Sequence, residues 1–144
     1  MIEFRIPGEP TAKGRARSFI RAGHIAHHTP AKTVAYEGLV ALAAQTAMSA
    51  ARLEPLQGAL AMTFVAVFAI PKGWTKKRLA AHAIQPEAVT KKPDLDNIMK
   101  ALSDGMNKVV YADDSQIAEL RCSKVYGALP GVLVRVWKTQ QEVA

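Results

Sequence analysis

The 144-residue chain is basic, with 19 Lys and Arg residues against 12 Asp and Glu, a formal net charge of +7 and a pI of about 9.8. Its hydrophobic fraction of 49% suits one core, so we expect a single domain over residues 1–144. No apolar run reaches the ~18 residues of a membrane span, the N-terminus lacks a signal-peptide pattern, and the only cysteine, Cys122, excludes an intrachain disulfide. These features predict a cytoplasmic protein with no membrane partner, and the positive charge favours nucleic acid as the partner.

The first part of the chain predicts a strand, a long loop and a helix. Residues 2–6 alternate between apolar and polar side chains, as a half-buried strand does. Residues 7–28 are rich in Gly, Pro and basic residues and predict an exposed loop that can contain a short hairpin. Thr29 as N-cap and Pro30 as the first helical residue then begin a helix that we expect to end at Leu53, before the next proline.

The remaining elements complete an α+β pattern. Residues 59–70 are apolar on both faces and predict a central strand covered on both sides, whereas residues 75–83 predict a short basic helix. An amphipathic helix is expected from Leu95 to about Lys108, followed by a turn and two strands, 117–127 and 131–138, joined as a hairpin. We therefore expect an α+β fold whose single mixed or antiparallel sheet packs with two main helices and one short helix.

All five aspartates of the chain fall in one segment: Asp94, Asp96, Asp104, Asp113 and Asp114. A purely structural interpretation is available for each pair. Asp94 is a natural N-cap with Asp96 in the first helical turn, and Asp113 with Asp114 makes an ordinary turn before a strand. For either pair taken alone, this interpretation stays open beside a functional one.

The joint pattern favours a metal site. The chain reverses between the helix and the turn, so the turn can return toward the helix start. Asp94 and Asp96 would point ~200° apart on a continuous helix and converge only if Asp94 lies outside it, as an N-cap does. Converging carboxylates repel one another unless a cation joins them, and a set of oxygen ligands suits Mg²⁺. Mg²⁺ held by aspartates is typical of phosphodiester hydrolysis.

Lys100 lies one turn after Asp96 on the same stripe of the helix. It either forms an i, i+4 pair with Asp96, worth only ~0.3–0.5 kcal/mol, or points its cation at a scissile phosphate. Asp104 lies one further turn along, ~12 Å from Asp96, so we expect it to form a supporting salt bridge with Lys100.

The segment "KPDLDN" (92–97), followed by Lys100, Asp104 and "VVYADDSQI" (109–117), resembles the RusA family of Holliday junction resolvases. "IPGEPTAKGRARS" near the N-terminus and "TPAKTVAYEGLV" resemble the family's opening loop and first helix, so the likeness covers nearly the whole chain.

The resemblance implies catalytic residues at Asp94, Asp96, Lys100 and Asp114, of which the three aspartates bind the metal. It further implies Mg²⁺ (for which Mn²⁺ can substitute), no nucleotide cofactor, and a homodimer that nicks four-way DNA. Asn97 and Asp113 match motif positions with less certain roles. Successive side chains of an extended segment point to opposite sides, and the resemblance favours Asp114, which leaves Asp113 to accept hydrogen bonds from turn amides.

Three basic clusters are the predicted DNA contacts: Lys13, Arg15 and Arg17 in the first loop, Lys76 and Lys77 on the short helix, and Lys91 with Lys92 before Asp94. Singly, each is equally a solvated surface charge. Phe19 suits either the core or stacking on a base at an open junction. The histidines at 24, 27 and 28 look like a metal triplet, but loop residues are the simpler interpretation.

We therefore predict a Mg²⁺-dependent endonuclease that resolves four-way junctions by paired symmetric nicks. One alternative is a non-catalytic protein that binds branched DNA. Another is a phosphatase or phosphotransferase with an Asp-x-Asp motif, but such enzymes place the pair after a strongly apolar strand, and residues 87–93 are not one.

Overall fold

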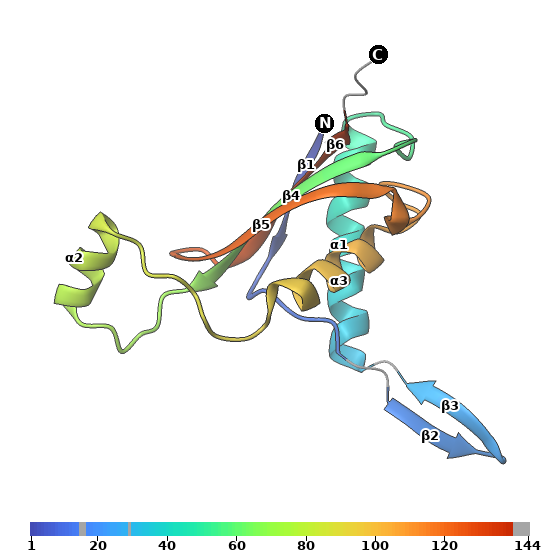
Figure 1. Ribbon diagram of the computed structural model, residues 1–144, viewed down its shortest axis with the longest axis horizontal. Coiled ribbons are helices and arrows are strands. Elements are labelled where there is room, and N and C mark those ends of the chain that lie inside the picture. The colour runs from blue at the N-terminus through green and yellow to red at the C-terminus, as the bar shows by residue number, and fades with distance from the viewer. Residues whose placement is uncertain (15–16, 29, 140–144) are drawn as a thin grey trace.

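The computed structural model describes residues 1–14, 17–28 and 30–139, and for residues 17, 27 and 28 it describes the backbone alone. The elements in chain order (Figure 1) are β1 (Ile2–Pro7), β2 (Arg17–Arg21), β3 (His24–His28), α1 (Ala31–Ala50), β4 (Leu60–Ala69), α2 (Lys76–Ile84), α3 (Leu95–Met106), the 3₁₀ turn η1 (Asp114–Gln116), β5 (Ile117–Gly127) and β6 (Gly131–Lys138). The fold is α+β, as predicted.

The main sheet is mixed and has the strand order β1-β6-β4-β5. β4 runs parallel to β5 and antiparallel to β6, and β6 runs antiparallel to β1. The predicted bounds of β5 and β6 are correct, but the predicted hairpin between them is wrong. β4, the most apolar strand, lies between them and pairs with both, so the chain between β5 and β6 must cross the end of β4.

The core lies on one face of this sheet, under α1 and α3 (Figure 1). Met62, Phe64 and Phe68 of β4 are buried there. The alternate residues of β4, such as Thr63 and Val65, are only half-buried. Cover on both sides was therefore a wrong prediction. The second face of this mixed sheet, which contains antiparallel pairs, is partly open to solvent.

α1 packs closely on α3 and fixes its position. Its buried residues, Thr33, Tyr36, Val40, Ala44 and Met48, form one stripe at helical spacing. A Cβ added to Gly105 of α3 would lie 2.7 Å from Val40, so a glycine is what lets the two helices approach. The predicted helix bounds need correction: Pro30 occupies the N-cap, Thr29 lies outside the described residues, and the helix ends at Ala50, before the positive φ of 55° at Arg52.

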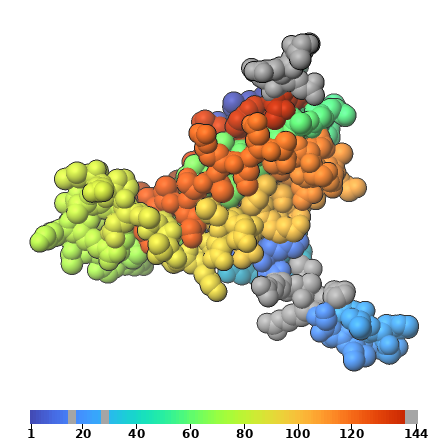
Figure 2. Space-filling model, viewed as in Figure 1, coloured from blue at the N-terminus to red at the C-terminus, as the bar shows by residue number. Residues whose placement is uncertain are grey.

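Two extensions stand off the body, with α3 between them in the view of Figure 1; Figure 2 shows the same two projections as solid surface. One is α2, which buries none of its residues. The other is the hairpin of β2 and β3, which turns at Ala22 and Gly23, both with positive φ as a tight two-residue hairpin requires. Phe19 on this hairpin is 44% exposed, so its core interpretation is wrong. Across the described residues, no helix is both long and apolar enough to cross a membrane.

Candidate functional site

The first aspartate pair lies at the start of α3. Asp94 has an extended backbone (φ −72°, ψ 153°) and occupies the N-cap, as predicted, and its carbonyl accepts the helical bond from the amide of Ile98 at 3.0 Å. Its side chain, however, makes no capping hydrogen bond. Asp96 follows in the first turn, and both side chains are exposed. The capping role that would explain Asp94 structurally is therefore not performed by its carboxylate.

The second pair lies in the turn before β5, where Asp113 caps η1. Its carboxylate accepts a hydrogen bond from the backbone amide of Ser115 at 3.0 Å, which confirms the role predicted for it. The hydroxyl and amide of Ser115, followed by the positive charges of Lys108 and Lys100, lower the pKa of Asp113. Asp113 is thus bound into the turn as an ionised structural group.

Gln116 braces this turn against the body, a role that the sequence reasoning missed. Its Oε1 accepts hydrogen bonds from the amides of Ala112 (3.0 Å) and Asp113 (3.1 Å). Its Nε2 donates to the carbonyls of Leu56 (3.0 Å) and Gly58 (3.1 Å). All four hydrogen-bonding capacities of the amide are used. The Asp-x-x-Gln spacing of a capping box was the local signal available.

Asp114 differs from its neighbour because its half-buried carboxylate makes no hydrogen bond or ion pair with any described residue. The turn nevertheless lies beside α3. The buried Tyr111 hydroxyl donates to the Ser103 carbonyl of α3 at 2.8 Å. Burial, and then the negative charges of Asp114, Asp104 and Asp113, raise the pKa of Tyr111. The hydrogen bond between Tyr111 and Ser103 ties the segment just before the Asp114 turn to the C-terminal half of α3.

Lys100 extends from the exposed side of α3, with 58% of its side chain accessible. Its Nζ lies 3.4 Å from Asp104 Oδ1, which confirms the predicted salt bridge. Its charge also contributes to the lowered pKa of Asp113, so the ammonium influences the turn as well as its own helix. Lys100 is therefore the cation shared by the helix stripe and the aspartate turn.

Lys13, predicted as a DNA contact, is half-buried, and its ammonium is paired with two carboxylates of the protein. Its Nζ donates to Asp104 Oδ2 at 2.6 Å and to Glu37 Oε1 at 2.9 Å. These partners hold the pKa of Lys13 above its ordinary value. Asp104 and Glu37 lie 91 and 24 residues from Lys13 along the chain. Because no local pattern links them, the sequence around Lys13 could not predict this arrangement.

The other predicted DNA contacts in the first loop and on α2 are placed in part. Lys76 and Lys77 are exposed on α2. Arg15 lies outside the described residues, and of Arg17 only the backbone, at the start of β2, is described. The DNA-contact role of all four stays a prediction.

The segment leading into Asp94 is anchored by Lys124 of β5, another residue that the sequence did not indicate. Its Nζ donates to the carbonyls of Lys91 (2.8 Å) and Pro93 (3.3 Å). The Lys91 ammonium lies 5.3 Å from the centroid of the Phe68 ring, and Lys92 is exposed beside it. The predicted DNA contacts Lys91 and Lys92 are therefore presented on a segment tied to the sheet.

The aspartates have the donor chemistry that a metal ion needs, but their side chains are spaced too widely in this structure to hold one together. Of the five aspartates, Asp94, Asp96 and Asp114 have carboxylates without a partner among the described residues, and oxygen-only donors of this kind suit Mg²⁺. Within the described ranges, no three His, Cys, Asp or Glu side chains lie close enough together to hold a metal. His24 belongs to no such group, and the side chains of His27 and His28 lie outside the described residues.

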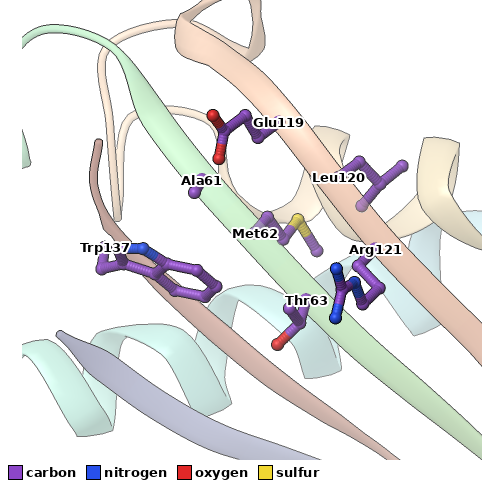
Figure 3. Close-up of a pocket in the computed structure, with 7 residues that line it drawn as sticks. All are labelled: Ala61, Met62, Thr63, Glu119, Leu120, Arg121 and Trp137. Carbon is purple, nitrogen blue, oxygen red and sulfur yellow. The ribbon is translucent and has the colours of Figure 1, made fainter. Parts of the chain in front are cut away.

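A separate hollow lies on the outer face of the sheet, with a volume of about 320 Å³ (Figure 3). Thr63, Arg121 and Trp137 are among its lining residues, and no aspartate lines it. Its walls are side chains of β4, β5 and β6, whereas the aspartates lie on α3 and the turn before β5. The hollow is therefore separate from the predicted aspartate site.

Comparison with known proteins identifies the family of the chain. The family model described as endodeoxyribonuclease RusA matches residues 7–137, which include both aspartate pairs, Lys100 and the main sheet except residues 2–6 of β1 and the last residue of β6. An uncharacterized protein of Bacillus subtilis (strain 168), YqaN, is 35% identical over 141 residues, covering 94% of each chain. With a match over most of its length, the chain belongs to the RusA endodeoxyribonuclease family.

Proposed function

We propose that this protein is a Mg²⁺-dependent endonuclease that resolves four-way DNA junctions by paired symmetric nicks. The observation that carries the proposal is that the carboxylates of the five aspartates fall into two groups, those with a partner in the chain and those without one among the described residues. Asp104 and Asp113 are satisfied by partners within the chain. Asp94, Asp96 and Asp114 have no such partner among the described residues, and they are the three that the family resemblance implies as metal ligands.

These three carboxylates would hold the metal. When bound, Mg²⁺ supplies an activated water and offsets the negative charge that develops on the phosphate. Unpaired carboxylates carry a full charge for a cation, whereas a carboxylate already bonded to amides or lysines would have to exchange those bonds for the metal. The family is one of endodeoxyribonucleases, and a metal requirement fits that chemistry.

Lys100 would stabilise the charge that develops at the phosphate. It lies one helical turn beyond Asp96, its ammonium is exposed, and its 3.4 Å contact with Asp104 is long for a charge-assisted hydrogen bond. The ammonium can therefore reach a phosphate held at the start of α3 without breaking a strong bond.

Affinity would come from the basic clusters at Arg15 and Arg17, at Lys76 and Lys77, and at Lys91 and Lys92 through contacts to the DNA backbone. Two symmetric nicks need two active sites related by a two-fold axis, and each chain provides one, so the working form would be a homodimer.

The test is cleavage of a labelled four-way junction and of a linear duplex with the same arm sequences, each with Mg²⁺ and with chelator. We expect paired nicks in the junction only with Mg²⁺. Asp94→Asn and Asp96→Asn should each reduce the cleavage rate by at least about a hundredfold, because loss of an outer partner of a metal already costs 10–100-fold. Junction affinity should stay nearly unchanged.

Glu119→Gln is the matched control, because Glu119 is an exposed carboxylate on β5 away from α3. It should cleave at the wild-type rate. Tight junction binding without any Mg²⁺-dependent cleavage would contradict the proposal and favour the non-catalytic DNA-binding alternative.

A further inference from the structure

Four charged side chains of alternating sign form a line that ends at Lys100. Glu37 accepts a hydrogen bond from Lys13 at 2.9 Å, Lys13 donates to Asp104 Oδ2 at 2.6 Å, and Asp104 Oδ1 lies 3.4 Å from Lys100. Glu37 belongs to α1, Lys13 to the segment after β1, and the last two to α3. We propose that Lys13 and Glu37, through Asp104, position the Lys100 ammonium, an inference that rests on the catalytic role of Lys100 proposed above.

The inner part of this line is held firmly. The side chains of Glu37, Lys13 and Asp104 are 24%, 30% and 17% exposed. The bonds to Asp104 and Glu37 raise the pKa of Lys13, which keeps its ammonium charged.

The backbone around Lys13 is also fixed between the two helices. Its amide donates to the Asn97 carbonyl of α3 at 3.2 Å. The next amide, of Gly14, donates to Thr33 Oγ1 of α1 at 2.7 Å. These backbone contacts hold Lys13 between α1 and α3, where its ammonium pairs with Glu37 and Asp104.

The two oxygens of Asp104 serve two lysines unequally. The 2.6 Å bond to Lys13 is short and takes up much of the carboxylate charge, which leaves only a long contact to Lys100. Removing the Lys13 charge would leave Glu37 and Asp104 both uncompensated beside Lys100. Their combined attraction would draw the Lys100 ammonium along α3, toward Asp104 and away from Asp96. Lys13 is therefore a positioning residue rather than a DNA contact.

Single-turnover cleavage and junction binding distinguish these roles. Lys13→Met removes the charge and keeps most of the length of the side chain. We expect the cleavage rate at saturating protein to fall on the order of tenfold, because small misplacements of a catalytic group are costly. Junction affinity and its salt dependence should stay within about twofold of wild type, since no phosphate contact is lost.

Further variants distinguish the positioning of Lys100 by Lys13 from a purely structural role in which Lys13 holds α1 against α3. Lys13→Arg should recover most of the rate. In the Lys13→Met background, adding Asp104→Asn should also raise the rate, because it removes the pull on Lys100. Lys138→Met, which removes an exposed lysine of β6 outside the line, is the control for the loss of one charge. A double variant slower than Lys13→Met would overturn the inference, as would a reduced salt dependence of binding in Lys13→Met.

One readout does not depend on nuclease activity. The ¹Hε–¹³Cε NMR signal of Lys100, assigned by its absence in Lys100→Arg, should move in Lys13→Met and stay in place in Lys138→Met, both in metal-free protein. An unmoved signal overturns the inference even if the protein is a junction nuclease. A moved signal in a protein that cleaves no DNA would refute the proposed function and leave the coupling of Lys13 to Lys100 standing.

Discussion

The start of α3 and the turn before β5 each carry two aspartates, yet the two regions treat them differently. At the start of α3 the carboxylates of Asp94 and Asp96 have no hydrogen-bond partner among the described residues. In the turn, the Asp113 carboxylate accepts a hydrogen bond from the Ser115 amide, whereas the carboxylate of Asp114, one residue on, has no partner among the described residues. Residue type and sequence neighbourhood therefore do not decide the role of a carboxylate; the donors that reach it do.

This difference follows a physical rule. A carboxylate that accepts amide or lysine hydrogen bonds serves the fold and holds its surroundings still, while a solvated one without a partner in the chain can bind an external cation without giving up such bonds. In the turn, the bonded Asp113 lies next to the unbonded Asp114, so the first can fix the backbone from which the second reaches out. Precise sites need such a supporting layer.

The largest expected effect tests this difference within one turn. Asp114→Asn should lower the cleavage rate by at least about a hundredfold, because a metal ligand is lost, and outer partners alone already account for 10–100-fold. Asp113→Asn keeps an acceptor oxygen for the Ser115 amide and should retain measurable activity. Single-turnover rates on a four-way junction, with both variants compared at equal folded fraction, provide the measurement.

The opposite ranking of these two variants would reverse the assignment of ligand and support. Equal losses in both would show that the turn presents two ligands, or that a second metal requires Asp113.

A smaller effect is expected at the brace of the turn. Gln116→Glu keeps an acceptor for the turn amides but loses both donations, and sets a carboxylate against the carbonyls of Leu56 and Gly58. We expect a cleavage rate roughly tenfold lower, in the range found for outer partners of metals, and a loss of about 1–3 kcal/mol in the free energy of unfolding. Chemical denaturation and single-turnover cleavage measure the two.

Gln45→Glu is the matched control for this variant. Gln45 donates to Ser49 on the exposed side of α1, far along the chain from the turn. It should leave both rate and stability close to wild type. Should Gln116→Glu behave in the same way, the turn would not need its tie to the segment before β4.

The features predicted correctly are those that depend on residues close together in the sequence. Alternation located β5 and β6 to the residue, the apolar stripe located α3, and a spacing of four residues predicted the Lys100–Asp104 pair. The insertion of β4 between β5 and β6 was not predicted, because strand pairing depends on which edges are free once the chain collapses.

The candidate site shows the same limit. The N-cap position of Asp94 and the capping role of Asp113 follow from local patterns and were predicted. The bond between Lys13 and Asp104 joins residues 91 apart, so a basic loop gave no sign that one of its lysines turns inward. Local patterns show which groups can do chemistry, and long-range packing decides which of them are left free to do it.

The smallest expected effect is a difference between Asp113 and Asp114 in how much each stabilises the fold. Ser115 and the nearby lysines lower the pKa of Asp113 in the folded state. A lowered folded pKa means that the ionised form stabilises the fold above the unfolded value, here 3.8, and that this contribution disappears as the pH falls through the lower folded value. The difference in melting temperature between wild type and Asp113→Asn should therefore be present at pH 6 and shrink steadily below pH 4.

Asp114→Asn breaks no hydrogen bond with a described residue and removes a negative charge beside Asp113, so its melting temperature at pH 6 should equal or exceed that of wild type. A marked fall in melting temperature for Asp114→Asn would mean that Asp114, like Asp113, is held by the fold, and the contrast between the two would be lost.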